Sequence, residues 1–223
     1  GHAGIEAALA SARLGCKTLL LTMNLDTVGL MACNPAVGGP AKSQLVREID
    51  ALGGQMGKTT DLTYLQMKML NTNKGPAVHA LRAQSDRSVY HLTMKQILEA
   101  QENLDLKQDE VVEISAGDHQ VEGVLTRTGM FYPGKNVVAT TGTFLRGVIH
   151  IGMRHMEAGR LGEFPSNELS ASLKKLGLRL GRLKTGTPAR LNKRSLDFSK
   201  MSIQPGDEPP KHFSFIWEYS QYG

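Results

Sequence analysis

The stretch GHAGIEAALASARLGCKTLLLT, residues 1–22, decides the fold that the sequence predicts. Its alanine-rich part, residues 5–14, is apolar on several faces, which is typical of a short helix packed closely on a sheet. Gly15 is placed to end that helix, and the apolar run at 18–22 is typical of a buried parallel strand. A helix followed at once by such a strand predicts the α/β class.

The glycines at the start of this stretch indicate a nucleotide ligand. Gly1 and Gly4 match the last part of a G-x-G-x-x-G loop, in which one glycine lets a pyrophosphate approach and another lets the helix pack on its strand. The amino end of the helix then attracts the phosphate charge. The acid that usually binds the ribose is missing after the strand, where Asp26 is the nearest carboxylate. The alternative is a glycine-rich turn with no ligand.

The composition excludes several classes of protein. With 223 residues, of which 40% are hydrophobic, the chain has enough apolar material for a sizeable core, so global disorder is excluded. No run approaches the roughly 18 consecutive apolar residues of a membrane span. Two cysteines cannot form a disulfide framework and favour a reducing compartment. Histidines without paired ligand spacing predict no metal site.

Hydrophobic spacing predicts the remaining elements. We expect a helix from Pro40 that Gly53 ends, and a long amphipathic helix at about 78–101 with Leu81, Val89, Leu92 and Leu98 among its apolar positions. The other expectations are strands at 64–70, 137–139 and 178–184, a hairpin of 109–115 with 120–127, and a helix at 166–176.

Cys33 is the candidate for nucleophilic chemistry. It lies in a predicted loop shortly before Gly38 and Gly39 and a helix start, where the helix dipole favours a thiolate. The glycine pair also suggests backbone N–H groups that face a ligand. The alternative is an inert small residue in a turn. We expect Cys16, at a helix–strand junction, to be buried packing.

A basic stretch lies near the end of the chain. Residues 170–200 contain nine lysines and arginines against Asp197 alone, and a phosphate backbone is a natural partner for such a stretch. The residues that we expect to contact nucleic acid are Lys174, Lys175, Arg182, Lys193 and Arg194. The alternative is a solvated basic face that acids elsewhere in space balance.

Taken together, these segments resemble one family, the MnmG (GidA) family of flavoproteins. The blocks that carry the resemblance are residues 1–8, 19–27, 33–39, 45–54, 69–71, 74–78, 82–84, 141–145 and 181–188. The resemblance extends over essentially the whole chain in collinear order. This sequence departs from the common family pattern at Pro40, Ser43, Gln44 and Asn167.

The resemblance implies a Rossmann-like FAD-binding domain of the two-dinucleotide-binding-domain type. Because the chain opens without Met and without a preceding strand, we expect a truncated front part of a longer protein, inactive alone and weak in FAD binding. Residues 1–190 would form the FAD-binding region, which lacks the first strand and first motif glycine. Residues 191–223 would begin an inserted α/β domain.

The resemblance also implies positions for the cofactor. Gly1 and Gly4 would lie on the FAD pyrophosphate, and His2 and Ala3 would line the same loop. Val111 matches a position that binds the adenine side of FAD. Ser166 matches another position that contacts the flavin cofactor.

The implied activity is that of a tRNA-modifying enzyme. FAD is reduced by NADH, and a one-carbon unit passes from methylenetetrahydrofolate to carbon 5 of the wobble uridine, with nitrogen from glycine or ammonium. Adding a thiolate to carbon 6 of uracil makes carbon 5 nucleophilic, and Cys33 falls on one of the family's two functional cysteines. Which of the two attacks uracil stays open, because the other lies outside this sequence.

The implied partners are tRNA, an MnmE-type GTPase and a second copy in a homodimer, with no membrane. The implied location is the bacterial cytoplasm, with the mitochondrion as the alternative. Three rival functions are a folate- and FAD-dependent tRNA uracil methyltransferase, a generic FAD- or NAD(P)H-dependent oxidoreductase, and a non-catalytic RNA-binding module. The missing C-x-x-C argues against a disulfide reductase, and the block at 33–39 favours the MnmG family over the methyltransferase.

Overall fold

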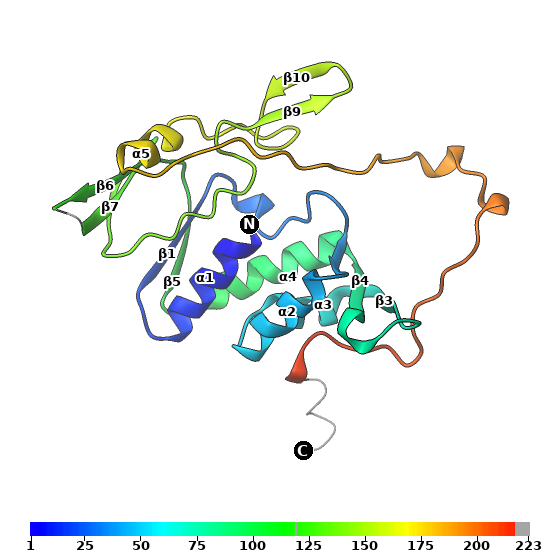
Figure 1. The fold of residues 1–223 in the computed structure, drawn as a ribbon. Coiled ribbons are helices and arrows are strands. Elements are labelled where there is room, and N and C mark those ends of the chain that lie inside the picture. Colours follow the sequence, from blue (N-terminus) through cyan, green and yellow to red (C-terminus); the bar gives the residue numbers. More distant parts are fainter. Residues whose placement is uncertain (119, 217–223) are drawn as a thin grey trace. The chain divides into compact units, whose positions relative to one another are not determined.

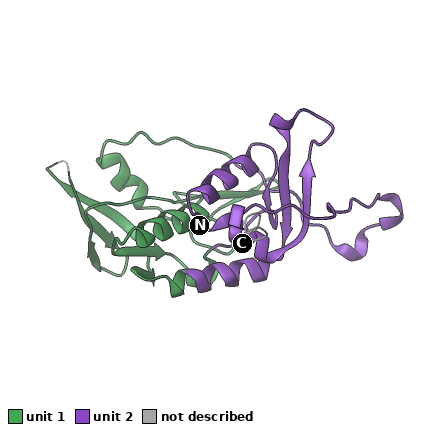
Figure 2. Ribbon diagram, turned by 90° about the horizontal axis from the view of Figure 1, so that it is seen from below, with its two compact units in different colours: residues 1–28, 98–184 green, residues 29–97, 185–223 purple. Residues whose placement is uncertain are grey.

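The computed structural model describes residues 1–118 and 120–216. The chain divides into two compact units, each built from two separate stretches of sequence (Figure 2). Unit 1 contains Gly1–Val28 and Leu98–Lys184, and unit 2 contains Gly29–Ile97 and Thr185–Gly223. The region at 191–223 that we expect to begin an inserted domain extends past the described residues, because 217–223 lie outside them.

Unit 1 is organised around one helix and a parallel pair of strands. Helix α1 (His2–Arg13) leads into β1 (Thr18–Thr22), which pairs in parallel with β5 (Leu104–Gln108) (Figure 1). The helix packs on both strands and buries its apolar side chains there. Gly15, with a φ of 85°, ends the helix in the left-handed conformation that glycine tolerates. The predicted helix and strand are confirmed, and the helix begins three residues earlier than expected.

A second part of unit 1 is an antiparallel meander covered by a helix. Its strands are β6 (Val111–Gly117), β7 (Gln120–Thr126) and β8 (Phe131–Pro133), and α5 (Leu169–Lys175) packs against β6. The buried core consists of Ile114, Val124, Leu169 and Leu173. The hairpin that the sequence predicts is confirmed as β6 and β7. A further hairpin, β9 (Val148–Ile151) with β10 (Arg154–Glu157), extends from the same unit.

Unit 2 is an antiparallel sheet with helices. The strand order is β2-β4-β3, with bounds β2 (Ala36–Gly38), β3 (Tyr64–Leu70) and β4 (Ala80–Ser85). Its helices are α2 (Lys42–Ala51), α3 (Met56–Thr63) and α4 (Arg87–Ala100), the last of which ends in unit 1. Three short 3-10 helices among the described residues of unit 2 are Pro76–Val78, Lys193–Ser195 and Phe198–Lys200. A further 3-10 helix, Leu25–Thr27, lies in unit 1.

Two buried carboxylates hold the end of the described chain in unit 2. Asp61 on α3 accepts hydrogen bonds from the backbone N–H groups of Phe213 at 2.9 Å and Ser214 at 2.7 Å. Asp50 on α2 accepts one from Phe215 N at 2.9 Å. Burial raises the pKa of Asp61, and the two N–H donors oppose that rise. The segment therefore contacts α2 and α3 through backbone groups, which sequence patterns do not reveal.

The long helix predicted at 78–101 is wrong in its first part. Residues 80–85 form β4, and α4 begins only at Arg87. The break lies at Asp86, whose carboxylate accepts hydrogen bonds from the N–H groups of Ser88 and Val89 and so caps the first turn of α4. The buried face of α4 is formed by Tyr90, Met94 and Leu98, whereas Val89 and Leu92 are exposed.

Two predicted strands are also wrong. Residues 137–139 are not a strand, and Val138 is 69% exposed. Residues 178–184 are irregular, and Leu183 is 97% exposed. An apolar or alternating run forms a strand only where it pairs with a neighbouring strand, and neither run belongs to a sheet among the described residues. The helix α3 was not predicted, because its buried positions include Thr59, Thr60 and Asp61 and so give no apolar period. The strand β5 was also not predicted, although Leu104 and Leu106 alternate with polar residues in it.

The predicted helix at 166–176 is confirmed, although α5 spans only Leu169–Lys175. The strand at 64–70 and the helix after Pro40 are confirmed as β3 and α2. Within the described residues, no helix combines the length and the apolar character that crossing a membrane requires.

Two residues of α4 test the corrected burial pattern. Met94 is 1% exposed and Leu92 is 54% exposed. Met94→Ala is expected to lower the free energy of unfolding by about 2–5 kcal/mol, because it leaves a cavity in the core. Leu92→Ala is expected to change it by less than about 1 kcal/mol. Chemical denaturation of both variants checks this, and an equal loss in the two would contradict the assigned face.

Candidate functional site

The first turn of α1 is open to an anion. No side chain caps it, it contains no acidic residue, and the first helical hydrogen bond runs from Ile5 N to Gly1 O at 3.1 Å. The amino end of a helix carries a partial positive charge that its own backbone does not neutralise. Since α1 turns back through a short connection into β1 and packs on it, this end lies at the carboxyl edge of β1 and β5.

The two glycines of the predicted loop have different surroundings. A Cβ on Gly4 would lie 2.7 Å from Thr140 Oγ1 and 3.7 Å from a methyl carbon of Leu20, so glycine allows α1 to approach both. A Cβ on Gly1 would meet no atom within 4 Å among the described residues. The close packing of the helix at Gly4 is one of the uses of glycine that the loop motif predicts.

A loop from the second stretch of unit 1 supplies a buried hydroxyl. Ser166 is 5% exposed, its N–H donates to Phe144 O at 2.8 Å, and its carbonyl accepts from Arg146 N at 2.8 Å. Its side-chain Oγ has no hydrogen-bond partner within residues 1–118 and 120–216. A buried hydroxyl without a partner is costly, so a ligand atom that bonds to it restores the lost hydrogen bond.

The same loop brings an arginine that sequence reasoning missed. Arg160 pairs with Glu163 at 2.8 Å and lies 5.3 Å from the ring centre of Phe144. Thr27, after β1, donates to Glu163 at 3.4 Å. A single arginine in an irregular glycine-containing loop gives no periodic or spacing signal, and only the fold brings it to the start of α1.

His2 is neutral near pH 7. Burial lowers its pKa to about 4, and the positive charge of Arg160 acts in the same direction. The effect of Arg160 shows that its guanidinium acts on the first turn of α1. Because the imidazole of His2 is neutral, it adds no charge to this site, and the positive charge comes from the amino end of the helix and from Arg160.

The residues in unit 1 therefore fit a dinucleotide. The uncapped start of α1 suits a pyrophosphate, and the unpartnered Ser166 hydroxyl suits a polar group of the same ligand. Ala3 is exposed in the same turn. Val111 begins β6, and its side chain packs against the Ile114 cluster.

Cys33 lies in unit 2 and its thiol is exposed. Its Sγ lies 3.9 Å from Asn34 Oδ1. Arg190, from a distant stretch of the same unit, donates to the backbone oxygen of Ala32 at 3.0 Å. A guanidinium therefore lies beside the loop that carries the thiol, a neighbour that the sequence did not indicate. The prediction that Cys16 is buried is wrong, because its thiol is also exposed.

The glycine pair after Cys33 packs against and hydrogen-bonds to the backbone of β4. A Cβ on Gly38 would collide with the carbonyl of Leu81 on β4, and Gly39 N donates to that carbonyl at 2.8 Å. The suggestion that these N–H groups face a ligand is therefore wrong for Gly39. Along the sequence, strand β2 lies between Cys33 and the start of α2 at Lys42.

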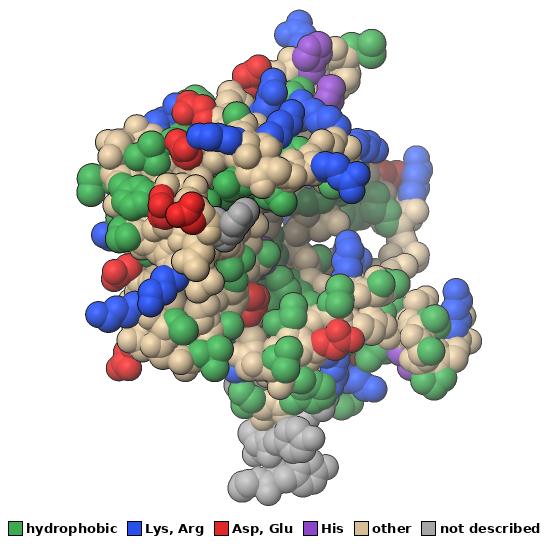
Figure 3. Space-filling view, turned by 60° about the vertical axis from the view of Figure 1, so that its left-hand side comes forward, with side chains coloured by type: hydrophobic (Ala, Val, Ile, Leu, Met, Phe, Trp, Pro, Cys, Tyr) green, Lys and Arg blue, Asp and Glu red, His purple; other side chains and the backbone are tan. Residues whose placement is uncertain are grey.

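The structure divides the predicted nucleic-acid residues into separate groups. Lys174 and Arg182 line one recess in unit 1, whereas Lys175 lies 3.8 Å from Glu113 as an ion pair. Lys193 and Arg194 are exposed in a 3-10 turn of unit 2. Figure 3 shows lysine and arginine side chains gathered at the top of the view, at the level of β9 and β10.

Known proteins similar to this chain agree on one family. The family model described as glucose inhibited division protein A matches residues 1–221. The tRNA uridine 5-carboxymethylaminomethyl modification enzyme MnmG of Pelobacter propionicus is 59% identical over 218 residues, which are 98% of this chain and 35% of that protein. The enzyme of the same name from Geobacter metallireducens is 57% identical over 218 residues, with the same coverage of both chains. This chain thus spans about 35% of the length of these relatives.

The solved structure of GidA from Aquifex aeolicus has the same fold. It is 57% identical, with a TM-score of 0.93 over 96% of this chain and 36% of that one. A GidA-related protein from Thermus thermophilus is 25% identical, with a TM-score of 0.56 over 79% of this chain and 65% of that one. The predicted α/β fold, Rossmann-like and with a parallel strand pair, is confirmed.

The contact at Gly4 makes a testable prediction. Gly4→Ala forces its new Cβ against Thr140 Oγ1 and is expected to lower the free energy of unfolding by about 1–3 kcal/mol. Gly4→Ala combined with Thr140→Ala removes that oxygen, leaves a distance of 3.7 Å to the remaining Cβ, and is expected to recover most of the loss. Thermal denaturation compares the two. A double variant as unstable as the single one would show that the helix does not rely on this contact.

Proposed function

Because the chain belongs to the glucose inhibited division protein A family, we propose that it forms the flavin-binding front part of a tRNA uridine 5-carboxymethylaminomethyl modification enzyme. The reaction would modify carbon 5 of the wobble uridine. The observations that carry the proposal are both in unit 1: the first turn of α1, which no side chain caps and which packs closely at Gly4, and the buried Ser166 hydroxyl, which has no hydrogen-bond partner among the described residues.

The residues of unit 1 would hold FAD in defined ways. The N–H groups of the first turn of α1 take the pyrophosphate, and Arg160 adds positive charge nearby. The Ser166 Oγ provides a hydrogen bond to the cofactor, and the backbone of Val111 borders the adenine side. FAD, when bound, supplies the redox and one-carbon chemistry, with NADH as reductant and methylenetetrahydrofolate as carbon donor.

Cys33 would act on the uracil ring. An exposed thiol on an irregular loop is accessible to a large substrate such as an RNA anticodon. As a thiolate it adds to carbon 6 of uracil, which makes carbon 5 nucleophilic, and it leaves again when carbon 5 loses its proton. We propose Cys33 as one of the two functional cysteines and leave the choice between it and the second one open.

The remaining assignments follow from the family resemblance. We propose tRNA, an MnmE-type GTPase and a homodimer as partners, with a bacterial cytoplasmic location. For the domains we propose an FAD-binding region at 1–190, followed by the start of an inserted domain at 191–223. That boundary lies a few residues after Lys184, where the chain passes from unit 1 into unit 2.

Two measurements on the product of the complete gene test the function. The purified protein is expected to show the visible absorption of an oxidised flavin, which NADH bleaches. Nucleoside analysis of tRNA from cells without the gene is expected to show loss of the carboxymethylaminomethyl group on the wobble uridine. A colourless protein together with unchanged nucleosides would favour a non-catalytic RNA-binding module instead.

The two exposed cysteines form a matched pair of variants. Cys33→Ser is expected to retain FAD and to change the free energy of unfolding by less than about 0.5 kcal/mol, because the side chain is exposed. It is expected to lose most of the wobble-uridine modification. Cys16→Ser, in the turn between α1 and β1, is expected to retain both. Normal modified uridine in Cys33→Ser would show that this thiol takes no part in the reaction.

Lys193 and Arg194 test the basic segment in unit 2. Replacing both with Ala is expected to weaken tRNA binding and to reduce the slope of log Kd against log salt by roughly one to two units, because each phosphate contact releases counterions. The FAD content is expected to stay unchanged, since neither residue lies in unit 1. Affinity measured at several salt concentrations decides this, and an identical slope would mean that these charges only face solvent.

A further inference from the structure

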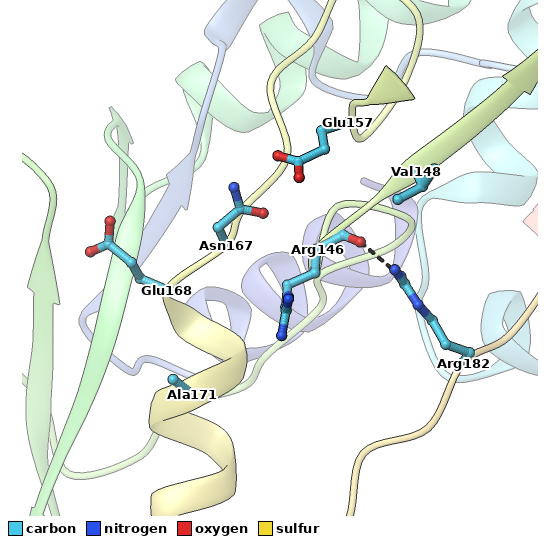
Figure 4. A pocket seen from close by; sticks show the side chains of 7 residues that line it. All are labelled: Arg146, Val148, Glu157, Asn167, Glu168, Ala171 and Arg182. Carbon is cyan, nitrogen blue, oxygen red and sulfur yellow. Dashed lines mark hydrogen bonds between the residues drawn. The ribbon is translucent and has the colours of Figure 1, made fainter. Parts of the chain in front are cut away.

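Two recesses in unit 1 share one pair of arginines. Arg182 Nη1 donates to the backbone oxygen of Arg146 at 2.7 Å, and both residues line both recesses (Figure 4). The volumes are about 370 Å³ and 340 Å³, a size class that accommodates a small ligand or part of a nucleotide chain. Arg146 lies outside the basic stretch at 170–200, so the sequence pattern did not include it.

The two recesses differ in charge. The larger one also contains Glu157 and Glu168, and in Figure 4 the guanidinium of Arg146 points toward α5 and away from Glu157. The smaller one, which we name the cationic recess, has no acidic lining residue. Its lining includes Leu145, Arg146, Ser170, Lys174, Leu180 and Arg182. It thus combines three positive charges with a hydroxyl and two leucines.

The three cations of the cationic recess have no counter-charge of their own. Within residues 1–118 and 120–216, no carboxylate forms an ion pair with Arg146, Lys174 or Arg182. The nearby Glu168 is paired instead with Arg127 at 3.0 Å. Like charges gathered around one hollow create a positive potential that attracts an anion.

The backbone of Arg146 adds an independent observation. Its φ of 43° lies in the left-handed region that residues with a side chain rarely adopt. The backbone is held there because Arg146 N donates to Ser166 O at 2.8 Å and Arg146 O accepts from Arg182. Glycine suits such a position better, so the side chain of Arg146 can be removed by glycine without straining the backbone.

We propose that the cationic recess binds a phosphodiester group of the tRNA substrate, with the adjoining nucleotide against Leu180. Three cations match a phosphate backbone, and the partly exposed Leu180 and the guanidinium planes offer surfaces on which a sugar or base packs. This assignment rests on the proposed function, because it takes tRNA as the polyanion. In this assignment, the side chain of Arg146 contacts the RNA directly.

The test uses the product of the complete gene and a tRNA transcript with uridine at the wobble position. Glycine at position 146 accepts the positive φ, so Arg146→Gly removes the guanidinium without straining the backbone. Arg146→Gly and Lys174→Ala are each expected to weaken tRNA binding about threefold to tenfold, and the double variant about 10-fold to 100-fold. The slope of log Kd against log salt is expected to fall by about one unit for each lost contact.

Two control variants distinguish the loss of positive charge in the cationic recess from a general effect of removing positive charge on tRNA binding. Lys17→Ala removes one exposed positive charge in the turn between α1 and β1, outside the recess, and is expected to leave binding unchanged. Lys174→Arg keeps the charge and is expected to bind like the wild type. Thermal denaturation and flavin absorbance establish that each variant is folded before its affinity is compared.

The outcomes distinguish this proposal from the function on which it rests. A double variant that binds tRNA with wild-type affinity and slope would overturn the recess as an RNA site, while flavin and wobble modification in the wild type would still support the function. A wild type that carries no flavin and modifies no tRNA would overturn the function, whatever the variants show. A wild type that binds no tRNA would overturn both.

Discussion

The close approach of α1 to Thr140 and Leu20 at Gly4 is the constraint on which the candidate flavin site depends. With no Cβ at this position, the helix lies against β1 and places its uncapped first turn at the carboxyl edge of the parallel pair. A larger residue would push the helix outward and move the very N–H groups that attract a phosphate. Arg160 adds a positive charge that acts on His2 in this turn, and the loop that bears Arg160 also contains the buried, unpartnered hydroxyl of Ser166.

Cofactor binding and nucleophilic chemistry are assigned to different units of the chain. The start of α1 belongs to unit 1, whereas the loop of Cys33 precedes β2 in unit 2. In unit 2, Arg190 donates to the backbone of that loop from a stretch far along the sequence. The interleaving of the two units explains why the basic residues of one continuous stretch serve separate surfaces, with Arg182 in one unit and Arg194 in the other.

Local patterns predicted the first helix and strand because both patterns are distinctive. An alanine-rich stretch that is apolar on several faces is typical of a helix packed on a sheet, and a short apolar run is typical of a buried strand. The same reasoning failed at residues 78–101, where Leu81 continues the helical spacing but lies on β4, and where only the Asp86 cap marks the break. Arg146 and Arg160 were beyond such reasoning, because their importance arises from contacts between loops distant in sequence. Gly4 was accessible from sequence because of the glycine spacing, and Cys33 because it lies in a predicted loop shortly before a glycine pair, whereas the exposure of Cys16 was not.

The most direct test of the account is an experimental structure of the complete gene product with FAD bound. The account predicts that the FAD pyrophosphate lies within hydrogen-bonding distance of the N–H groups at the start of α1, and that the Ser166 hydroxyl has gained a partner on the cofactor. A flavin bound elsewhere, with the first turn of α1 facing only solvent or protein and the Ser166 hydroxyl unchanged, would contradict it.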